Sequence, residues 1–208
     1  MLSIAVFGSG RGSNFQAILT ALHHNRIPGA RIRLVVSNNS TAGILDIARA
    51  NSLPALHISR SQYSTEDEFV DALLAALRDH DVNFIVLAGY MKRLSPRLIA
   101  SFRGRIINIH PALLPRFGGQ GMYGIHVHEA VIAAGERTSG ATVHMVDEEY
   151  DHGAIILQKK ITVLPDDTPA TLSARVLEIE HEIYPEAIRL FAEGKVAITT
   201  TSAVDHHR

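Results

Sequence analysis

The fold is decided first by residues 2–14, which read LSIAVFGSGRGSN. The opening six residues form a short apolar run, which is typical of a strand buried on both faces of a sheet. A glycine-rich loop follows, and then a helix that we expect to be capped by Ser13 or Asn14 and to reach about His23. A strand, a glycine loop and a helix in this order predict the first unit of a parallel α/β sheet.

The same alternation of apolar runs and amphipathic stretches continues to residue 111. We expect strands at residues 32–36, 55–58, 84–88 and 106–110, and helices at residues 42–50, at 65–79 and from Ser95 onward. The helix at 65–79 should begin with a capping box formed by Thr65 and Glu68. Strands that alternate with helices predict a doubly wound, mostly parallel sheet.

The pattern changes in the second half of the chain. Residues 142–146 and 155–163 read as two strands joined by an acidic loop, which predicts an antiparallel addition at one edge of the sheet. Residues 168–195 predict a long C-terminal helix, which Pro185 should end or kink because proline lacks an N–H group. We therefore expect one domain over residues 1–197 and a polar tail over residues 198–208.

Composition limits the classes of protein to which the chain can belong. It has 208 residues, of which 46% are hydrophobic, and a net charge of -1 from 20 basic and 21 acidic side chains. This near-neutral balance argues against a partner such as duplex nucleic acid. No apolar run approaches the length of a membrane span, and residues 1–7 lack the features of a signal peptide. Cysteine is absent, so thiol chemistry is excluded. We expect a cytoplasmic enzyme.

The glycine loop has the context of a phosphate site. Glycines allow a close backbone approach, and the following helix offers free N–H groups, with Ser13 and Asn14 as further donors. The spacing is not that of the dinucleotide fingerprint, and the second strand does not end in the acidic residue that binds the ribose of NAD. A tight strand-to-helix turn without a ligand is the alternative.

Asn108 and His110 end the fifth strand and share one face of it. Ligands of open parallel sheets bind beyond the carboxyl ends of the strands. A buried strand is expected to be apolar to its end, but this one presents an amide and an imidazole there. An amide can donate a hydrogen bond to a developing oxyanion, and an imidazole can transfer a proton near neutral pH. The alternative is a pair of polar groups that only cap the strand.

The acidic loop over residues 147–153 reads DEEYDHG. It is either a solvated connection between strands or the source of a carboxylate held beside His110, which would favour the imidazolium form and orient the ring. The spacing of the histidines elsewhere in the chain does not match a metal site, so we expect no metal.

Several of these motifs together resemble the phosphoribosylglycinamide formyltransferase family, over nearly the whole chain from Ile4 to about Lys195. The resemblance rests on the order and spacing of residues 8–18 (GSGRGSNFQAI), 87–91 (LAGYM), 108–115 (NIHPALLP), 140–144 (GATVH), 151–153 (DHG) and 180–185 (EHEIYP). It implies a Rossmann-like formyltransferase fold and a transferase of purine biosynthesis. The implied reaction moves a formyl group from 10-formyltetrahydrofolate to the amine of glycinamide ribonucleotide.

The resemblance also implies which residues carry this activity. Gly12, Ser13 and Asn14 would bind the substrate phosphate, and Glu180 would reach the ribose or glycinamide end. A larger set would bind the folate: Met91, Lys92, Arg93, Leu94, Asn108 and Asp147.

Asn108, His110 and Asp151 match the catalytic trio of the family. Asn108 and protonated His110 would stabilise the oxyanion, and Asp151 would raise the pKa of His110 and assist proton transfer to the folate nitrogen. No metal and no cofactor other than the folate co-substrate would be needed. The expected oligomeric state is a monomer or a homodimer.

Two features depart from the family pattern. Glu66 or Asp67 falls where a basic residue often contacts the folate tail, and Lys92, Arg93 or Arg60 could take over that role. Residues 118–124 form a longer loop than in the shortest family members, which is either a mobile flap or an insertion without a role. The alternative activity is that of a formyltetrahydrofolate deformylase, which would need no phosphate site. A nucleotide-sensing protein that has lost catalysis is a further alternative.

Overall fold

The computed structural model describes residues 1–196, so the predicted polar tail over residues 198–208 lies outside the described residues. Seven strands form one sheet in the order β3-β2-β1-β4-β5-β6-β7. The strands are β1 (Leu2–Phe7), β2 (Ala30–Ser37), β3 (Ala55–His57), β4 (Phe84–Leu87), β5 (Ile106–His110), β6 (Thr138–Met145) and β7 (Ile155–Thr162). The helices are α1 (Ser13–His23), α2 (Gly43–Ala50), α3 (Glu66–Asp79), α4 (Pro96–Ser101), α5 (Ile125–Ala133) and α6 (Pro169–Ala192), with a short 3-10 turn at Arg60–Gln62.

The sheet is parallel from β3 to β5, and β6 and β7 are added to it in antiparallel orientation. The prediction of a doubly wound, mostly parallel sheet with an antiparallel edge and a long C-terminal helix is confirmed. Strand order reverses at β1, because β2 and β3 lie on one side of it and β4 and β5 on the other. The loops after β1 and β4 therefore diverge at this point, which is where open α/β sheets bind their ligands.

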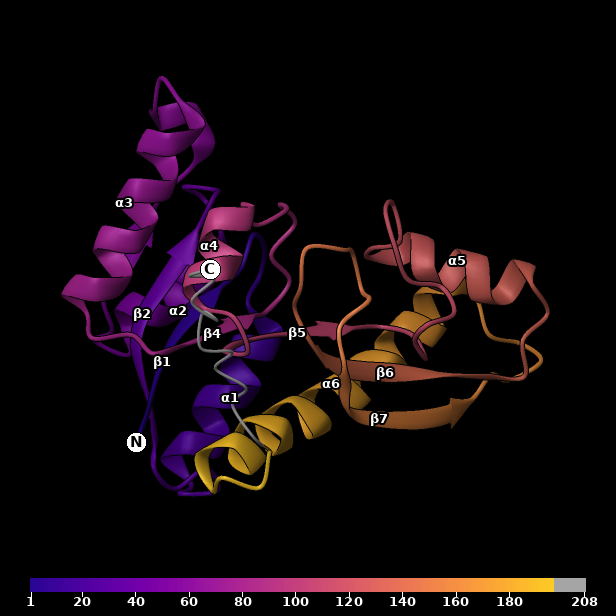
Figure 1. The fold of residues 1–208 in the computed structure, drawn as a ribbon. Coiled ribbons are helices and arrows are strands. Elements are labelled where there is room, and N and C mark those ends of the chain that lie inside the picture. The colour runs from indigo at the N-terminus through magenta and orange to yellow at the C-terminus, as the bar shows by residue number, and fades with distance from the viewer. Residues whose placement is uncertain (197–208) are drawn as a thin grey trace, which may run out of the picture.

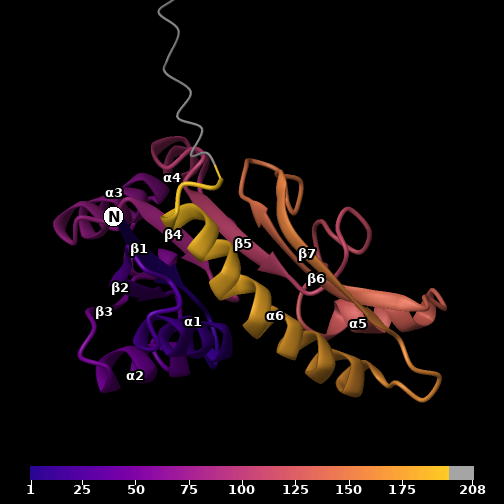
Figure 2. The same cartoon turned by 90° about the horizontal axis from the view of Figure 1, so that it is seen from below.

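Alternating side chains of the strands pack into two hydrophobic clusters. Ile4 and Val6 of β1 belong to the cluster that contains residues of α1, α2 and α6, whereas Ala5 and Phe7 belong to the cluster that contains residues of α3 and α4. Figure 1 shows α3 and α4 on one side of the sheet and α1 and α6 on the other. Figure 2 shows α6 running along the sheet between α1 and α5.

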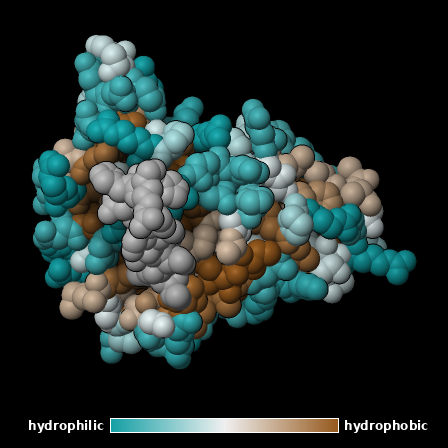
Figure 3. Space-filling view, viewed as in Figure 1, coloured by the Kyte–Doolittle hydropathy of each residue, from teal (hydrophilic) through white to brown (hydrophobic). Residues whose placement is uncertain are grey.

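The surface in Figure 3 is mostly polar over the tip of α3, and apolar residues gather near β7 and α6. Partly buried residues of the edge strand, Ile156, Leu157 and Ile161, pack against the cluster that α6 completes. Two consecutive lysines, Lys159 and Lys160, interrupt the apolar character of this edge, as is common where unpaired strand edges must not associate. Within residues 1–196, no helix combines the length and the apolar character needed to cross a bilayer.

Three details of the helices differ from the sequence-based predictions. Gly12, not Ser13 or Asn14, is the residue before α1, and it has φ +84°, a conformation that strongly favours glycine. A Cβ atom at this position would lie 2.9 Å from the Cα atom of Ile44, so the close approach of α2 also requires glycine here. Helix α5 is a further element that the sequence analysis did not predict.

Helix α6 continues through Pro185 to Ala192, so the prediction that Pro185 could end the helix is wrong, whereas the predicted kink stays a prediction. Proline removes one backbone hydrogen bond from a helix, but packing of an apolar face can outweigh this loss. Pro185 is buried, and its neighbours Tyr184, Ala187 and Ile188 belong to the main hydrophobic cluster. By contrast, the capping box of Thr65 and Glu68 is present as predicted.

Tyr184 fixes α6 to the sheet at the end of β4 and the start of β5. Its side chain is fully buried, and its hydroxyl group donates to the carbonyl oxygens of Leu87 (2.8 Å) and Ile107 (3.2 Å). We expect Tyr184→Phe to lower the free energy of unfolding by about 1–2 kcal/mol, because two buried carbonyl groups lose a donor. Urea unfolding measures this change. Tyr123→Phe, at a side chain that is 54% exposed, is the matched control, and an equal effect of the two substitutions would contradict the assignment.

Candidate active site

A cleft of about 660 Å³ opens at the point where strand order reverses. Its walls come from the loop after β1, the loop after β4, the end of β5, the loop before α5, the acidic loop after β6, and α6. Among the predicted site residues, it brings together Asn14, Met91, Lys92, Arg93, Leu94, Asn108, His110, Asp147, Asp151 and Glu180. Gly12 and Ser13 are not among the lining residues, and Ser13 instead lines a separate small groove together with Gln16 and His181.

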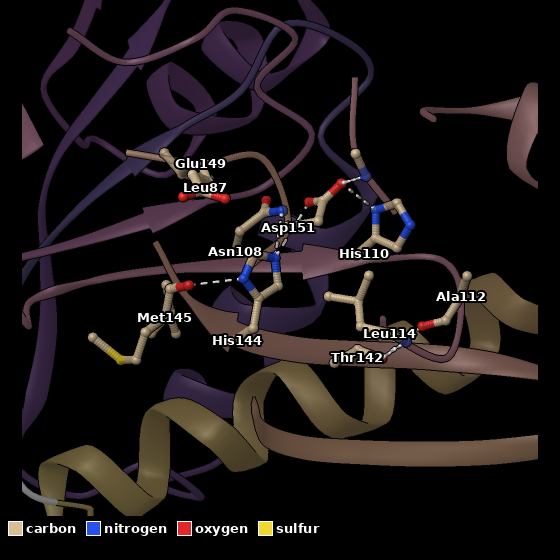
Figure 4. Close-up of polar contacts among 12 residues, drawn as sticks. Leu87, Asn108, His110, Ala112, Leu114, Thr142, His144, Met145, Glu149 and Asp151 are labelled. Carbon is tan, nitrogen blue, oxygen red and sulfur yellow. Dashed lines mark hydrogen bonds and ion pairs between the residues drawn. The ribbon is translucent and has the colours of Figure 1, made fainter. Parts of the chain in front are cut away.

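Asp151 lies at the centre of the polar contacts in this cleft. Its Oδ2 atom lies 3.5 Å from Nδ1 of His110 and accepts a hydrogen bond from the backbone N–H of Gly119 at 3.0 Å. Its Oδ1 atom lies 3.5 Å from Nε2 of His144. Figure 4 shows the carboxylate between the two imidazole rings. The predicted proximity of Asp151 to His110 is therefore present in the structure.

The backbone at Asp151 adopts φ +54°, in the left-handed region. Aspartate tolerates this conformation better than most residues, but it still stores local strain. Two other carboxylates of the loop have partners of their own. Asp147 contacts His152 at 2.9 Å, and Glu148 contacts Arg103 at 2.6 Å. Three of the four carboxylates of the loop thus have separate partners, which reduces their mutual repulsion, and Asp151 is the one that lies between two histidines.

Burial disfavours the negative charge on Asp151, and polar neighbours favour it. Burial raises the pKa of its carboxyl group, but nearby His144, nearby His110 and the N–H of Gly119 together lower it by more, so the net pKa lies below its usual range. Asp151 is therefore ionised at neutral pH.

His110 behaves differently from the prediction made for it. Its side chain is only 4% exposed, and burial lowers the pKa of the imidazole by more than Asp151 and the carbonyl oxygen of Phe117 raise it. The net pKa is lower than the usual value, so the predicted rise is wrong. Its physical cause, a nearby carboxylate, is present, but burial outweighs it.

The hydrogen bonds of His110 define its tautomer. Nε2 lies 2.7 Å from the carbonyl oxygen of Phe117, which can only accept, so Nε2 carries the hydrogen. In the neutral ring, Nδ1 then presents a lone pair to the carboxylate of Asp151. A proton that arrives at Nδ1 would be shared with Asp151, so this pair is arranged to take up a proton rather than to hold one beforehand.

His144 is a site residue to which the sequence analysis gave no role. It pairs with Asn108 across β5 and β6, and its Nδ1 donates to the carbonyl oxygen of Met145 at 2.8 Å. While the ring is neutral, Nε2 can accept a hydrogen bond from Nδ2 of Asn108 at 3.1 Å, whereas a protonated ring would donate from Nε2 towards Asp151. This contact fixes the Asn108 amide with its N–H groups on the side of Asp151 and leaves one N–H hydrogen free. The sequence of β6 could have indicated this residue, because Thr142 and His144 share one face of the strand whereas the alternate residues Ala141, Val143 and Met145 are apolar.

The end of the cleft beside α1 and α6 contains a buried acid in addition to Asp151. Glu180 of α6 accepts a hydrogen bond from Nδ2 of Asn14 at 2.6 Å. Burial raises the pKa of Glu180 to about 7, and the bond from Asn14 only partly offsets this effect. Arg11, which the sequence analysis did not assign to the site, lines the same end of the cleft.

At the other end of the cleft, Arg93 is held by the acidic loop. Its guanidinium group donates to the carbonyl oxygen of Glu148 at 2.6 Å and lies 5.4 Å from the centre of the Tyr150 ring. Arg60 instead contacts Glu66 at 3.0 Å and does not line the cleft. Residues 119–124 of the longer loop line the cleft directly, so this segment is part of the site wall and not a remote insertion. Within residues 1–196, no three His, Asp or Glu side chains form a group suited to one metal ion.

The raised pKa of Glu180 predicts a specific dependence of stability on pH. The folded state binds the proton more tightly than the unfolded state, so the stabilising effect is complete below the unfolded pKa and is lost as pH rises through about 7. Relative to Glu180→Gln, the parent protein should lose up to about 3 kcal/mol between pH 4.5 and pH 8, measured by urea unfolding at several pH values. The control is Glu182→Gln, at an exposed residue of α6 that contacts Lys159, and its stability difference should stay flat over this range. A flat difference for Glu180→Gln would show that this carboxyl group has an ordinary pKa.

Comparison with known proteins shows where this architecture belongs. The family model described as formyl transferase matches residues 2–188. The phosphoribosylglycinamide formyltransferase of Haemophilus influenzae is 41% identical over 95% of this chain and 91% of that protein. A chloroplastic phosphoribosylglycinamide formyltransferase of Arabidopsis thaliana is 42% identical over 93% of this chain, and the chain spans 66% of the length of that relative.

The solved structures agree with the sequence relatives. Glycinamide ribonucleotide transformylase 1 from Symbiobacterium toebii superposes with a TM-score of 0.88 at 40% identity, over 96% of this chain and 92% of that one. A formyltetrahydrofolate deformylase from Pseudomonas syringae superposes with a TM-score of 0.84 at 23% identity, over 96% of this chain and 64% of that one, which shows a shared fold alone. The chain therefore belongs to the formyl transferase family and, within it, to the phosphoribosylglycinamide formyltransferases.

Proposed function

We propose that this chain transfers the formyl group of 10-formyltetrahydrofolate to the amine of glycinamide ribonucleotide, in the purine pathway, with Asn108, His110 and Asp151 as the catalytic residues. The observation that carries the proposal is the buried carboxylate of Asp151, held between His110 and His144 beside the Asn108 amide. These groups line one cleft, large enough for a folate and a ribonucleotide to meet.

Each proposed residue has a role that follows from its chemistry. The amine nitrogen bonds to the formyl carbon, the bond from that carbon to the folate nitrogen breaks, and one proton moves from the amine to that nitrogen. The tetrahedral intermediate between these steps carries an oxyanion, to which Asn108 can donate its free N–H. His110, neutral in the empty cleft, takes up charge as this oxyanion develops, and the ionised Asp151 stabilises the imidazolium.

The two substrates are proposed to enter from opposite ends. Met91, Lys92, Arg93, Leu94 and Asp147 would hold the folate on the side of the loops after β4 and β6. The ribonucleotide would lie on the side of α1 and α6, with its phosphate at the backbone N–H groups of Gly12, Ser13 and Asn14 and its ribose or glycinamide end at Glu180.

An absorbance assay of folate release tests the proposal. Release that depends on added glycinamide ribonucleotide supports formyl transfer to an amine. Release that is equally fast without the ribonucleotide would instead identify hydrolysis of formyltetrahydrofolate, and absence of any release would contradict both activities. A cytoplasmic location and a monomeric or dimeric state stay predictions, which cell fractionation and light scattering would check.

Asp151→Asn tests the proton-transfer machinery, because it keeps the shape of the side chain and removes its charge. We expect turnover to fall by roughly a hundredfold or more, the scale of lost acid–base assistance, with nearly unchanged binding of both substrates. Steady-state kinetics and calorimetry measure the two effects. Glu129→Gln is the control, since its carboxylate contacts His126 at 3.0 Å on the exposed face of α5. Turnover and a pH profile equal to those of the parent would show that Asp151 is not catalytic.

A further inference from the structure

His128 is a buried imidazole for which the mechanism above has no use. It lies on α5, is only 2% exposed, and has an Nδ1 atom without a hydrogen-bond partner among the described residues. Buried polar atoms of side chains nearly always have partners, because leaving one unpaired costs free energy. His128 also lines the catalytic cleft, and its Nε2 atom, unlike Nδ1, is not among the fully buried unpaired atoms of residues 1–196, so a bound molecule can hydrogen-bond the ring at Nε2.

The position of His128 assigns it to one of the two substrates. Helix α5 packs against α6, which contributes Ser173 and Glu180 to the cleft, and Figure 2 shows these two helices side by side. The loops that would hold the folate, residues 91–94 and 147–151, come from other parts of the chain. His128 is thus on the wall of the ribonucleotide end, and it is near enough to His110 to be affected by its charge.

The chemistry of His128 suits an uncharged polar ligand. Burial, together with a smaller effect of nearby His110, lowers its pKa to about 4, so the ring is neutral at physiological pH. A neutral imidazole offers one donor and one acceptor. It therefore matches the arm of the substrate that carries an amine and an amide, rather than the dianionic phosphate group.

We propose that His128 hydrogen-bonds the glycinamide arm of the acceptor substrate and holds its amine towards the formyl carbon. This inference rests on the proposed function, since it takes the amine-bearing ribonucleotide as the occupant of that end of the cleft. Holding a nucleophile in place lowers the entropic part of the barrier, so a single contact of this kind can matter for the rate.

His128→Leu removes both ring nitrogens and keeps an apolar side chain of similar size. We expect the KM for glycinamide ribonucleotide to rise by about three- to tenfold, the scale of one hydrogen bond, while the KM for 10-formyltetrahydrofolate is unchanged. The melting temperature should stay equal or rise, because an unpaired buried polar group has been removed. His128→Gln, which restores a hydrogen-bonding group, should recover part of the affinity.

His126→Leu is the matched control. It lies two residues away on the same helix, its Nδ1 contacts Glu129 at 3.0 Å in solvent, and it does not line the cleft. Both KM values of this variant should equal those of the parent. A merely structural role of His128 predicts instead that both KM values of His128→Leu change together and that the melting temperature falls.

Nitrogen NMR of the parent protein tests the contact without any substitution. The ring nitrogens of His128 should shift when glycinamide ribonucleotide is added, and should not shift when inorganic phosphate is added alone. Unshifted resonances at saturating ribonucleotide, or an unchanged KM in His128→Leu, would overturn the inference while leaving formyl transfer by the parent intact. Failure of the parent to transfer a formyl group to the ribonucleotide would overturn the proposed function and this inference together.

Discussion

A buried negative charge, the carboxylate of Asp151 held between His110 and His144, is the constraint on which the site depends. Burial opposes this charge, the N–H of Gly119 compensates for it, and the two imidazoles do so whenever they are protonated. His110 is fixed by β5, His144 by β6 and Asp151 by the loop after β6. The register of the antiparallel pair β5–β6, in which Asn108 faces His144, therefore sets the geometry of the catalytic groups. A slip of one residue would turn each of these side chains to the opposite face.

Most of the fold could be predicted from the sequence, because it depends on local patterns. Apolar runs, the glycine loop after β1 and the capping box at Thr65 indicate their elements without knowledge of the partners. The exceptions depend on contacts between distant residues. Helix α6 continues through Pro185 because its buried face packs on the sheet, and the conformation of Gly12 depends on the approach of Ile44 from α2. Neither contact is visible in a local pattern.

The site could be predicted less completely, and burial is the reason. Resemblance to a family indicated which side chains meet in the cleft, including Asp151 and Glu180 from far along the chain. It did not indicate how strongly each of them is buried, and burial decides the protonation of His110 and Glu180. His128 had no predicted role in substrate binding for the same reason, since a histidine in a helix gives no sign of being buried.

The protonation states of the cleft form a consistent set. Around the ionised Asp151, burial favours the neutral forms of His110 and His128 and raises the pKa of Glu180 to about 7. The same physical effect acts on a bound amine, because removal from water disfavours its ammonium form. An amine must be uncharged to attack a carbonyl carbon, so burial of the substrate amine in this cleft favours its reactive form. In the proposed mechanism, the ionised Asp151 then stabilises the positive charge that develops on His110 as the oxyanion forms.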